Sequence, residues 1–346
     1  MLSRVADAIY WMNRYIERAE NVARFIDVNL HLMLDMPAGT ADQHWAALVD
    51  TTGDRPVFAE RYGKATKEHV VAFLTFDTQY PSSILSCVQA ARDNARSVRE
   101  VISSEMWEQV NTFYLLVREA VSNAQVIEEP HAFFTKIKTA SHLFVGIMDA
   151  TMSHGEGWHF GWLGRLLERA DKTSRILDVK YFLLLPTVQD VGTPMDDIQW
   201  AAVLRSASAF EMYRKRFGRL SPAQVADFLV LDRAFPRAMH YCLVKAEESL
   251  HAISGAPLGT FQNAAEQRLG RLRSELDYAD IDEIIANGLH EFLDTFQEKL
   301  NDVGEAICDT FFALRSLAVP VTRLSMAETT LPAPAYAPRM SQQQSM

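Results

Sequence analysis

Residues 14–20 read RYIERAE and residues 165–171 read RLLERAD, so one seven-residue pattern occurs twice at an offset of 151 positions. The first copy lies within residues 9–27, where apolar residues recur every three or four positions and charged residues fill the spaces between them. On a helix of 3.6 residues per turn, this spacing puts the apolar side chains on one arc and the charged ones on the other. The pattern therefore predicts that each copy lies on a long amphipathic helix.

Further identical residues extend the repeat along the chain. They follow at an offset of 151 and then of 155: Arg24 and Arg175, Asp27 and Asp178, Trp45 and Trp200, Phe73 and Phe228, Asp77 and Asp232, Pro81 and Pro236, Cys87 and Cys242. Identities in one order at a nearly constant offset indicate an internal duplication. We predict two related halves, about 1–156 and 157–317, that share a core around a pseudo-two-fold axis. The change of offset places a short insertion between Tyr181 and Trp200.

The rest of the chain also reads as helices. Its 15 glycines and 13 prolines gather in short clusters, and no alternating run is long enough to predict a strand. We predict an all-α fold, an internally duplicated helical bundle over residues 1–317, followed by a proline-containing disordered tail over 318–346. The expected helices are 3–34, 41–50, 66–78, 82–102, 104–127, 130–153, 158–184, 195–217, 222–232, 235–254, 260–277 and 284–316.

Charge and composition exclude several classes of protein. The 346 residues include 34 basic and 44 acidic ones, a net charge of −10, which argues against a nucleic-acid binder. Three distant cysteines form neither a zinc motif nor a disulfide framework. No apolar segment near the N-terminus has the length of a signal peptide or a membrane span. We therefore expect a cytoplasmic protein without a nucleic-acid or membrane partner.

The charged residues of the repeated pattern allow three interpretations. They can form ion pairs along solvated helix faces, as Glu20 and Arg24 would at four residues' distance. They can form a buried network that locks the two halves, with Glu17 and Glu168 each satisfied by arginines. They can also line a pocket between the halves for an anionic or amino-acid-like ligand, because arginine matches carboxylates and phosphates. In that case the arginines of both patterns contact the ligand: Arg14, Arg18, Arg165 and Arg169.

Other arginines occur in one half only, which makes them candidates for a specialised role. Arg92, Arg96 and Arg99 fall on one stripe of a predicted helix, and their counterparts at offset 155 are not arginines. Arg233 and Arg237 are specific to the second half in the same way. If the repeated helices pack about a shared axis, the two groups come together and can bind an anion. Separate surface arginines are the alternative.

The segment 154–159 reads HGEGWH and precedes the second copy of the pattern. Glycines at a helix start can leave backbone N–H groups free for an anion. His154, Glu156 and His159 resemble metal ligands, but the glycines break the helix that would align them, so we expect no metal site. The segment is either a loop whose aromatic residues fill the core or a ligand-contacting loop that includes His154.

Four blocks together resemble the bacterial alpha-E domain proteins: residues 10–21, residues 95–100 with 105–108, residues 164–171, and residues 232–237. The resemblance extends to about residue 315. One departure is Asn13, where the opening signature has glycine, and we expect this change to affect local packing only. The resemblance implies an all-helical bacterial protein associated with a circularly permuted ATP-grasp protein, a transglutaminase-like peptidase and, in some cases, a proteasome-like hydrolase. That context suggests a system that makes or attaches peptide or amide bonds.

Three functions are compatible with these observations. The first is a companion of an ATP-grasp-type ligase that binds the ligase or a carboxylate-bearing substrate; it has no cofactor of its own, and ATP and Mg belong to the ligase. The second is a stand-alone enzyme acting on amino acids or peptides, with Glu156 or Glu168 as general acid or base. The third is a scaffold without a ligand. The candidate ligand contacts are Arg14, Glu17, Arg18, Arg92, Arg96, Arg99, Glu100, His154, Arg165, Glu168, Arg169, Asp232, Arg233 and Arg237.

Overall fold

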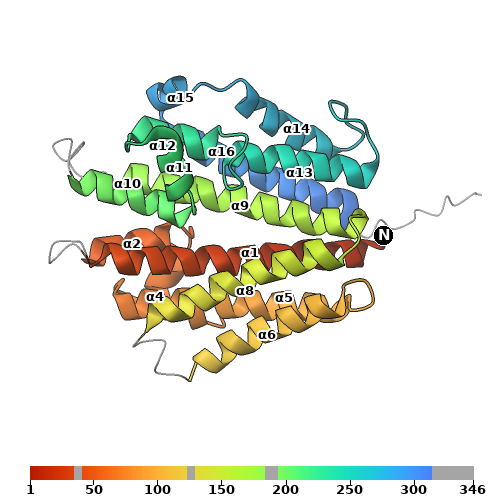
Figure 1. Cartoon of the computed structure of the whole chain (residues 1–346), viewed down its shortest axis with the longest axis horizontal. Helices are drawn as coiled ribbons and strands as arrows, with labels where there is room; N and C mark the ends of the chain where they lie inside the picture. The colour runs from red at the N-terminus through yellow and green to blue at the C-terminus, as the bar shows by residue number, and fades with distance from the viewer. Residues whose placement is uncertain (35–40, 123–128, 184–193, 314–346) are drawn as a thin grey trace, which may run out of the picture. The chain divides into compact units, whose positions relative to one another are not determined.

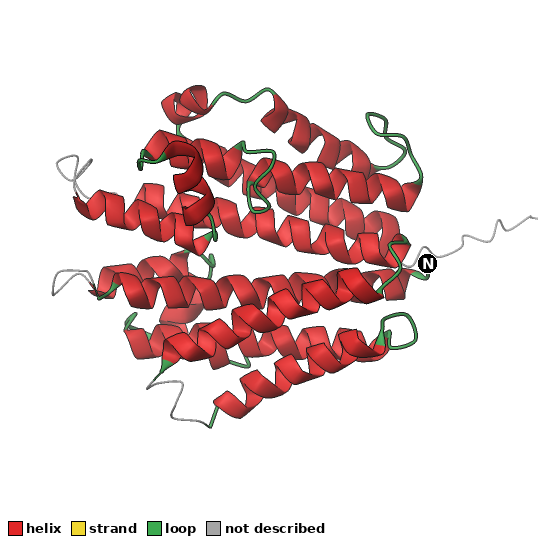
Figure 2. Ribbon diagram, viewed as in Figure 1, coloured by secondary structure: helices red, strands yellow, loops and turns green. Residues whose placement is uncertain are grey.

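The computed structural model describes residues 1–34, 41–122, 129–183 and 194–313, and all regular structure within these ranges is helical (Figure 2). The predicted all-α class is confirmed. The helices are α1 (Ser3–Leu32), α2 (Ala41–Asp50), α3 (Arg55–Tyr62), α4 (Lys67–Phe76), α5 (Ile84–Ser97), α6 (Ser104–Ala120), α8 (Pro130–Thr151), α9 (Glu156–Leu183), α10 (Pro194–Ser206), α11 (Phe210–Phe217), α12 (Pro222–Val230), α13 (Met239–Ser254), α14 (Ala264–Asp277), α15 (Ile281–Asn287) and α16 (Leu289–Ile307). A π-helical turn, η1 (Cys308–Phe312), follows α16.

The helices α1 and α9 lie side by side at the centre (Figure 1). On one side α5 and α8 pack against α1, and α6 packs against both of them. On the other side α13 and α16 pack against α9, and α14 packs against both of those. The apolar arc predicted for α1 is buried, as Ile9, Met12 and Ile16 show with exposures of 0%. The repeated charged pattern therefore lies in the middle of the molecule.

Glycines allow α1 and α9 to approach closely. A Cβ atom at Gly164 would lie 2.5 Å from the backbone oxygen of Tyr10, a distance that no side chain can accept. A Cβ atom at Gly161 would lie 2.6 Å from the side-chain nitrogen of Asn13. Asn13 is buried and donates from that nitrogen to the backbone oxygen of Ile9 at 3.0 Å. Asn13 thus lies where the two central helices approach each other closely.

Several contacts of the first half have parallels in the second at the sequence offsets given above. The two buried thiols each donate to a proline carbonyl, Cys87 to Pro81 at 3.7 Å and Cys242 to Pro236 at 3.6 Å. Two further ion pairs correspond: Arg61 with Asp77, and Arg216 with Asp232. These are structural parallels to the predicted duplication, which itself stays an interpretation of the sequence.

The predicted helices differ in number from the structure in three places, and several others begin or end a few residues from the predicted bounds. Helix α3 was not predicted. The predicted helix 195–217 is two helices, because the chain turns at Ser208, a non-glycine residue with φ +53°. The predicted helix 284–316 is divided at Gly288, where φ is +109°. The predicted insertion before Trp200 and the predicted tail fall largely or wholly outside the described residues. None of the described helices combines the length and apolar character that a membrane crossing requires.

Candidate functional site

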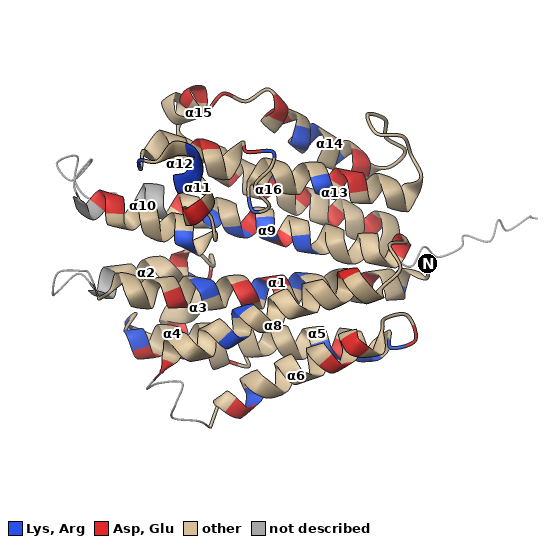
Figure 3. Ribbon diagram, viewed as in Figure 1, with Lys and Arg blue, Asp and Glu red and all other residues tan. Residues whose placement is uncertain are grey.

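The central helices α1 and α9 pack against each other, and both carry charged residues along their length (Figure 3). Around Glu168 of α9, Arg18 of α1 donates from Nε to Oε1 at 2.6 Å and from Nη2 to Oε2 at 2.9 Å. Arg14 donates from Nε to Oε2 of Glu168 at 3.0 Å, and Lys172 Nζ lies 3.7 Å from Oε1. We call this set the Glu168 centre. Its carboxylate is held by three cations, two of them from the opposite helix.

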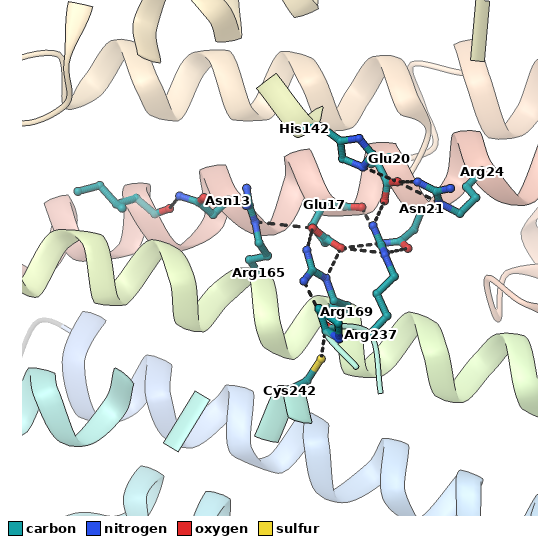
Figure 4. A network of polar contacts seen from close by, with 12 residues as sticks. Asn13, Glu17, Glu20, Asn21, Arg24, His142, Arg165, Arg169, Arg237 and Cys242 are labelled. Carbon is teal, nitrogen blue, oxygen red and sulfur yellow. Dashed lines mark hydrogen bonds and ion pairs between the residues drawn. The ribbon is translucent and has the colours of Figure 1, made fainter. Parts of the chain in front are cut away.

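A related arrangement surrounds Glu17 of α1 (Figure 4). Arg169 of α9 donates from Nε to Oε1 at 2.8 Å and from Nη2 to Oε2 at 3.0 Å. Arg237, in the connection between α12 and α13, donates from Nη1 to Oε1 at 3.2 Å. Arg165 Nε lies 3.6 Å from Oε2, which is an ion pair without a hydrogen bond. We call this set the Glu17 centre.

A second carboxylate accompanies each centre. Beside Glu17, Glu20 accepts hydrogen bonds from Arg24 and, at 2.8 Å, from Arg237 Nη2. Beside Glu168, Asp171 accepts from Arg175 Nε at 3.0 Å and from Lys172 Nζ at 3.0 Å. The expected pair of Glu20 and Arg24 along one helix is therefore present, within a larger network that joins α1, α9 and the α12–α13 connection.

The network is buried and carries excess positive charge. Glu17 is 1% exposed, and Glu168 and Arg165 are 0% exposed. Among the described residues, eight cations contact the four carboxylates: Arg14, Arg18, Arg24, Arg165, Arg169, Lys172, Arg175 and Arg237. The excess of four positive charges favours the ionised form of each carboxylate.

The pKa values follow from this balance. Burial raises the pKa of Glu17, but Arg169 and Arg237 outweigh burial and lower it to about 2. Burial acts on Glu168 in the same way, and Arg18 and Lys172 hold the pKa of that carboxyl well below its usual range. A carboxylate that stays ionised and bound to several cations is poorly suited to donate or accept a proton in catalysis. The geometry therefore matches the interpretation as a buried network that locks the two halves.

Arg165 is the exception within this network. Its Nε, Nη1 and Nη2 atoms are buried and have no hydrogen-bond partner among the described residues. Its guanidinium instead lies 5.8 Å from the ring centre of Trp162 and 6.0 Å from that of Phe144. Burial lowers the pKa of Arg165 to about 10, despite the attraction of Glu17.

The arginines predicted to meet at one anion site have separate partners. Arg92 donates to Asn111 Oδ1 at 2.7 Å, and Arg99 lies over the ring of Trp107 at 4.8 Å. Arg96 pairs with Asp93 at the surface. Arg233 pairs with Asp277 at 2.8 Å, so of the two predicted groups Arg237 is the member found in the central network.

The remaining candidates from the sequence have local contacts. His154 donates to the backbone oxygen of Asp149 at 3.0 Å and stacks on Trp158. Glu156 lies 2.7 Å from the amino group of Met1. The Asp232 carboxylate accepts hydrogen bonds from backbone N–H groups of the α12–α13 connection. Glu100 is exposed and follows the end of α5. None of these four residues has a described contact with the Glu17 or Glu168 centre.

Sequence reasoning missed a pocket of about 570 Å³ beside the Glu20 end of the network. Helices α1 and α8 form one wall, and α10 and the start of α11 form the other. The charged and imidazole side chains on its walls are Arg24, Asp27, His31, Lys138, Arg205 and Glu211. They come from four separate segments, and only Arg24 and Asp27 belong to the repeat, so no motif in the sequence marks the pocket.

The chain is similar to the family model Alpha-E, described as a predicted alpha-helical domain with a conserved ER motif, which matches residues 1–312. Both repeated patterns contain the Glu-Arg dipeptide, at 17–18 and at 168–169. Uncharacterized proteins of Mycobacterium bovis and Mycobacterium tuberculosis are 25% identical over 336 residues. The match covers 90% of this chain and 37% of theirs, so the chain spans just over a third of the length of these curated relatives. No solved structure matches.

Proposed function

We propose, from the premise that this chain belongs to the Alpha-E family, that it is the companion of an ATP-grasp-type ligase. The ligase would bind ATP and Mg and form peptide or amide bonds in the bacterial cytoplasm. This chain would hold a carboxylate-bearing or amino-acid-like substrate, or a segment of the ligase. A transglutaminase-like peptidase is a further partner in the proposal, through the family resemblance.

The charged pocket between the halves is the observation that carries the proposal. Arg24, Lys138 and Arg205 supply cations, and Asp27 and Glu211 supply carboxylates. Cations recognise a substrate carboxylate, and a carboxylate recognises a substrate amine. A volume of about 570 Å³ suits a small amino acid or peptide ligand. The opposite walls come from different halves, so the network between α1 and α9 would position both sides of the pocket.

The length of the relatives supports a partnership. In the mycobacterial proteins, the region that matches this chain accounts for 37% of the polypeptide. The same kind of domain therefore occurs joined to a larger remainder of chain. We infer that this domain, too, works beside another polypeptide.

A ligand-free scaffold is the second candidate, and the paired carboxylates favour it. Glu17 and Glu168 are both buried and bound to arginines of the opposite helix. The stand-alone enzyme has less support, because Glu168 is held ionised and Glu156 pairs with the amino group of Met1. A scaffold would bind its partner protein but would not bind amino acids.

The test combines the purified protein with an ATP-grasp ligase of the same bacterium, ATP, Mg and amino acids. We expect ATP-dependent formation of a condensed product, detected by its mass, that requires both proteins. Arg205→Ala should raise KM for the carboxylate substrate about tenfold, because a charge-assisted hydrogen bond contributes about 1.5–3 kcal/mol.

Arg214→Ala is the matched control. Arg205 and Arg214 both lie over the ring of Phe210, at 4.7 and 5.7 Å, but only Arg205 lines the pocket. The control should leave KM unchanged. Absence of product with two folded proteins would contradict the ligase partnership. Equal effects of the two substitutions would contradict the pocket as the substrate site.

A further inference from the structure

Two imidazoles and a carboxylate meet at the edge of the charged pocket. Asp27 of α1 is 3% exposed, and its Oδ1 lies 2.7 Å from His131 Nδ1 of α8 and 3.8 Å from His31 Nδ1 of α1. The rings of His31 and His131 lie edge to face with their centres 4.5 Å apart. One ligand atom from each of the three residues lies within 4.8 Å of the others. Asp27 and His31 also line the pocket.

This donor set has the chemistry of a transition-metal site. Imidazole suits zinc, copper, iron and nickel, whereas calcium and magnesium prefer oxygen ligands. Bonds of about 2.0–2.2 Å to zinc place tetrahedral ligand atoms about 3.4 Å apart. The ligand atoms of the three residues lie within 4.8 Å of one another, and Asp27 Oδ1 lies 2.7 Å from His131 Nδ1, so side-chain rotations can bring them to that spacing.

Outer contacts hold the three ligands in place. Lys138 donates to Oδ2 of Asp27 at 2.6 Å, which fixes the carboxylate and leaves Oδ1 toward the two imidazoles. His31 Nδ1 donates to the backbone oxygen of Asp27 at 2.8 Å. A histidine that binds a metal through one ring nitrogen commonly donates its other N–H to a carbonyl or carboxylate. In that arrangement His31 Nδ1 keeps its hydrogen bond to Asp27, and His31 binds the ion through Nε2.

The second half contains a similar pair of a carboxylate and an imidazole, but it has no second histidine in the position of His31. Asp178, at offset 151 from Asp27, accepts a hydrogen bond from His290 Nδ1 at 2.6 Å. The pair of carboxylate and imidazole is thus present in both halves. The residue at offset 151 from His31 is Phe182. Lys138 follows His131 by seven residues, whereas the residue seven positions after His290 is Gln297. The second histidine and the lysine belong to the first half.

We propose that Asp27, His31 and His131 bind a divalent transition-metal ion of the zinc class at the wall of the pocket. Three protein ligands leave at least one coordination position for water or for a ligand in the pocket, as in sites where the metal takes part in binding or chemistry. The inference does not rest on the proposed partnership with a ligase. The metal alone is sufficient to test it.

The experiment uses the untagged full-length chain after dialysis against EDTA. Zn²⁺ is titrated by calorimetry, and Co²⁺ by its visible absorption, which reports the coordination geometry. We expect saturable binding of one ion per chain. His31→Ala and His131→Ala should each weaken binding about tenfold or more. Both side chains are more than half exposed, at 53% and 61%, so the variants should fold, as circular dichroism would verify.

His290→Ala is the matched control, because it removes the corresponding imidazole from the half without the third ligand. It should leave affinity for Zn²⁺ unchanged. The proposal is overturned if the wild-type chain shows no saturable binding, or if His31→Ala binds as tightly as the wild type. It is equally overturned if His290→Ala weakens binding as much as His131→Ala does.

Discussion

The Glu168 centre and the Glu17 centre are made from the same pattern and have different pairings. In the Glu168 centre, Arg14 and Arg18 both donate hydrogen bonds to the carboxylate. In the Glu17 centre, Arg169 binds as Arg18 does, whereas Arg165, the counterpart of Arg14, remains 3.6 Å away without a hydrogen bond. The repeated pattern therefore accounts for the pairs Arg18–Glu168 and Arg169–Glu17, which are alike in the two centres. Whether the remaining arginine, Arg14 or Arg165, also forms a hydrogen bond depends on the residues around each centre.

A single position outside the pattern accounts for the difference. Arg237 brings an extra guanidinium to Glu17 and Glu20. At offset 155 the first half has Ser82, whose hydroxyl lies 3.4 Å from Arg18 Nη1 and carries no charge. Arg237 occupies oxygens of Glu17 and Glu20 and adds a like charge beside Arg165, which lowers the gain from an Arg165 hydrogen bond. The following predictions test this comparison.

The largest effect should come from Glu168→Gln. The substitution leaves Arg14, Arg18 and Lys172 without their shared counter-charge in a buried environment, which typically costs about 3–5 kcal/mol of unfolding free energy. Urea denaturation measures the change. Glu275→Gln, which breaks the exposed pair with Lys299, is the control and should cost less than about 1 kcal/mol. Equal costs for the two variants would show that the Glu168 centre does not stabilise the fold.

The second effect is a loss of stability in acid. The pKa of Glu17 is lowered from 4.5 to about 2 in the folded protein, so folding favours the ionised form. Its contribution is complete above pH 4.5 and is lost as the pH falls toward 2, by about 3 kcal/mol for this group. Denaturation curves between pH 7 and pH 2 should show a steeper decline for the wild type than for Glu17→Gln. Identical slopes would contradict the lowered pKa.

Arg237→Ser should have an intermediate effect, because it converts the Glu17 centre toward the composition of the Glu168 centre. Glu17 keeps Arg169 and can gain a hydrogen bond from Arg165, so we expect a cost of about 1–3 kcal/mol, below that of Glu168→Gln. A crystal structure of the variant should show the distance from Arg165 Nε to Glu17 Oε2 shortened to that of a hydrogen bond. An unchanged distance would mean that Arg237 is not what keeps Arg165 apart.

The smallest effect should come from Arg165→Met. This guanidinium makes no hydrogen bond to the described residues, and its burial is unfavourable, as its lowered pKa indicates. A methionine of similar length keeps the contacts with Trp162 and Phe144, so the unfolding free energy should change by less than about 1 kcal/mol or increase. Arg14→Met, the counterpart in the Glu168 centre, should cost more. A loss above about 3 kcal/mol for Arg165→Met would contradict this difference.

Part of this arrangement could be predicted from the sequence. The period of apolar residues predicted helices α1 and α9, and the repeated pattern predicted a buried network of glutamates and arginines as one of three interpretations. The break at Ser208 has no local signal, because alanines and not glycine or proline flank it. The missing hydrogen bond between Arg165 and Glu17 involves, in our account, Arg237, which is 72 positions away in the chain. Contacts between residues so far apart in the sequence can be identified only once the relative positions of the helices are known.

The pocket illustrates the same limit. Its walls combine Asp27 and His31 of α1 with Lys138 of α8 and Arg205 of α10. Asp27 and His31 are one turn apart on α1, but no spacing within one helix relates them to Lys138 and Arg205, so sequence periodicity cannot join the whole set. Arg92 and Arg99 lie over the ring of Trp107 on α6, and no described contact joins them to Arg237, so the approach of the two arginine groups stays a prediction.

A double-mutant cycle on two corresponding pairs tests the comparison most directly. One cycle combines Arg14→Met with Glu168→Gln, and the other combines Arg165→Met with Glu17→Gln. We predict a coupling free energy of about 2 kcal/mol for Arg14 and Glu168 and less than about 0.5 kcal/mol for Arg165 and Glu17. Equal coupling energies in the two cycles would contradict the account that Arg237 keeps Arg165 from a hydrogen bond with Glu17.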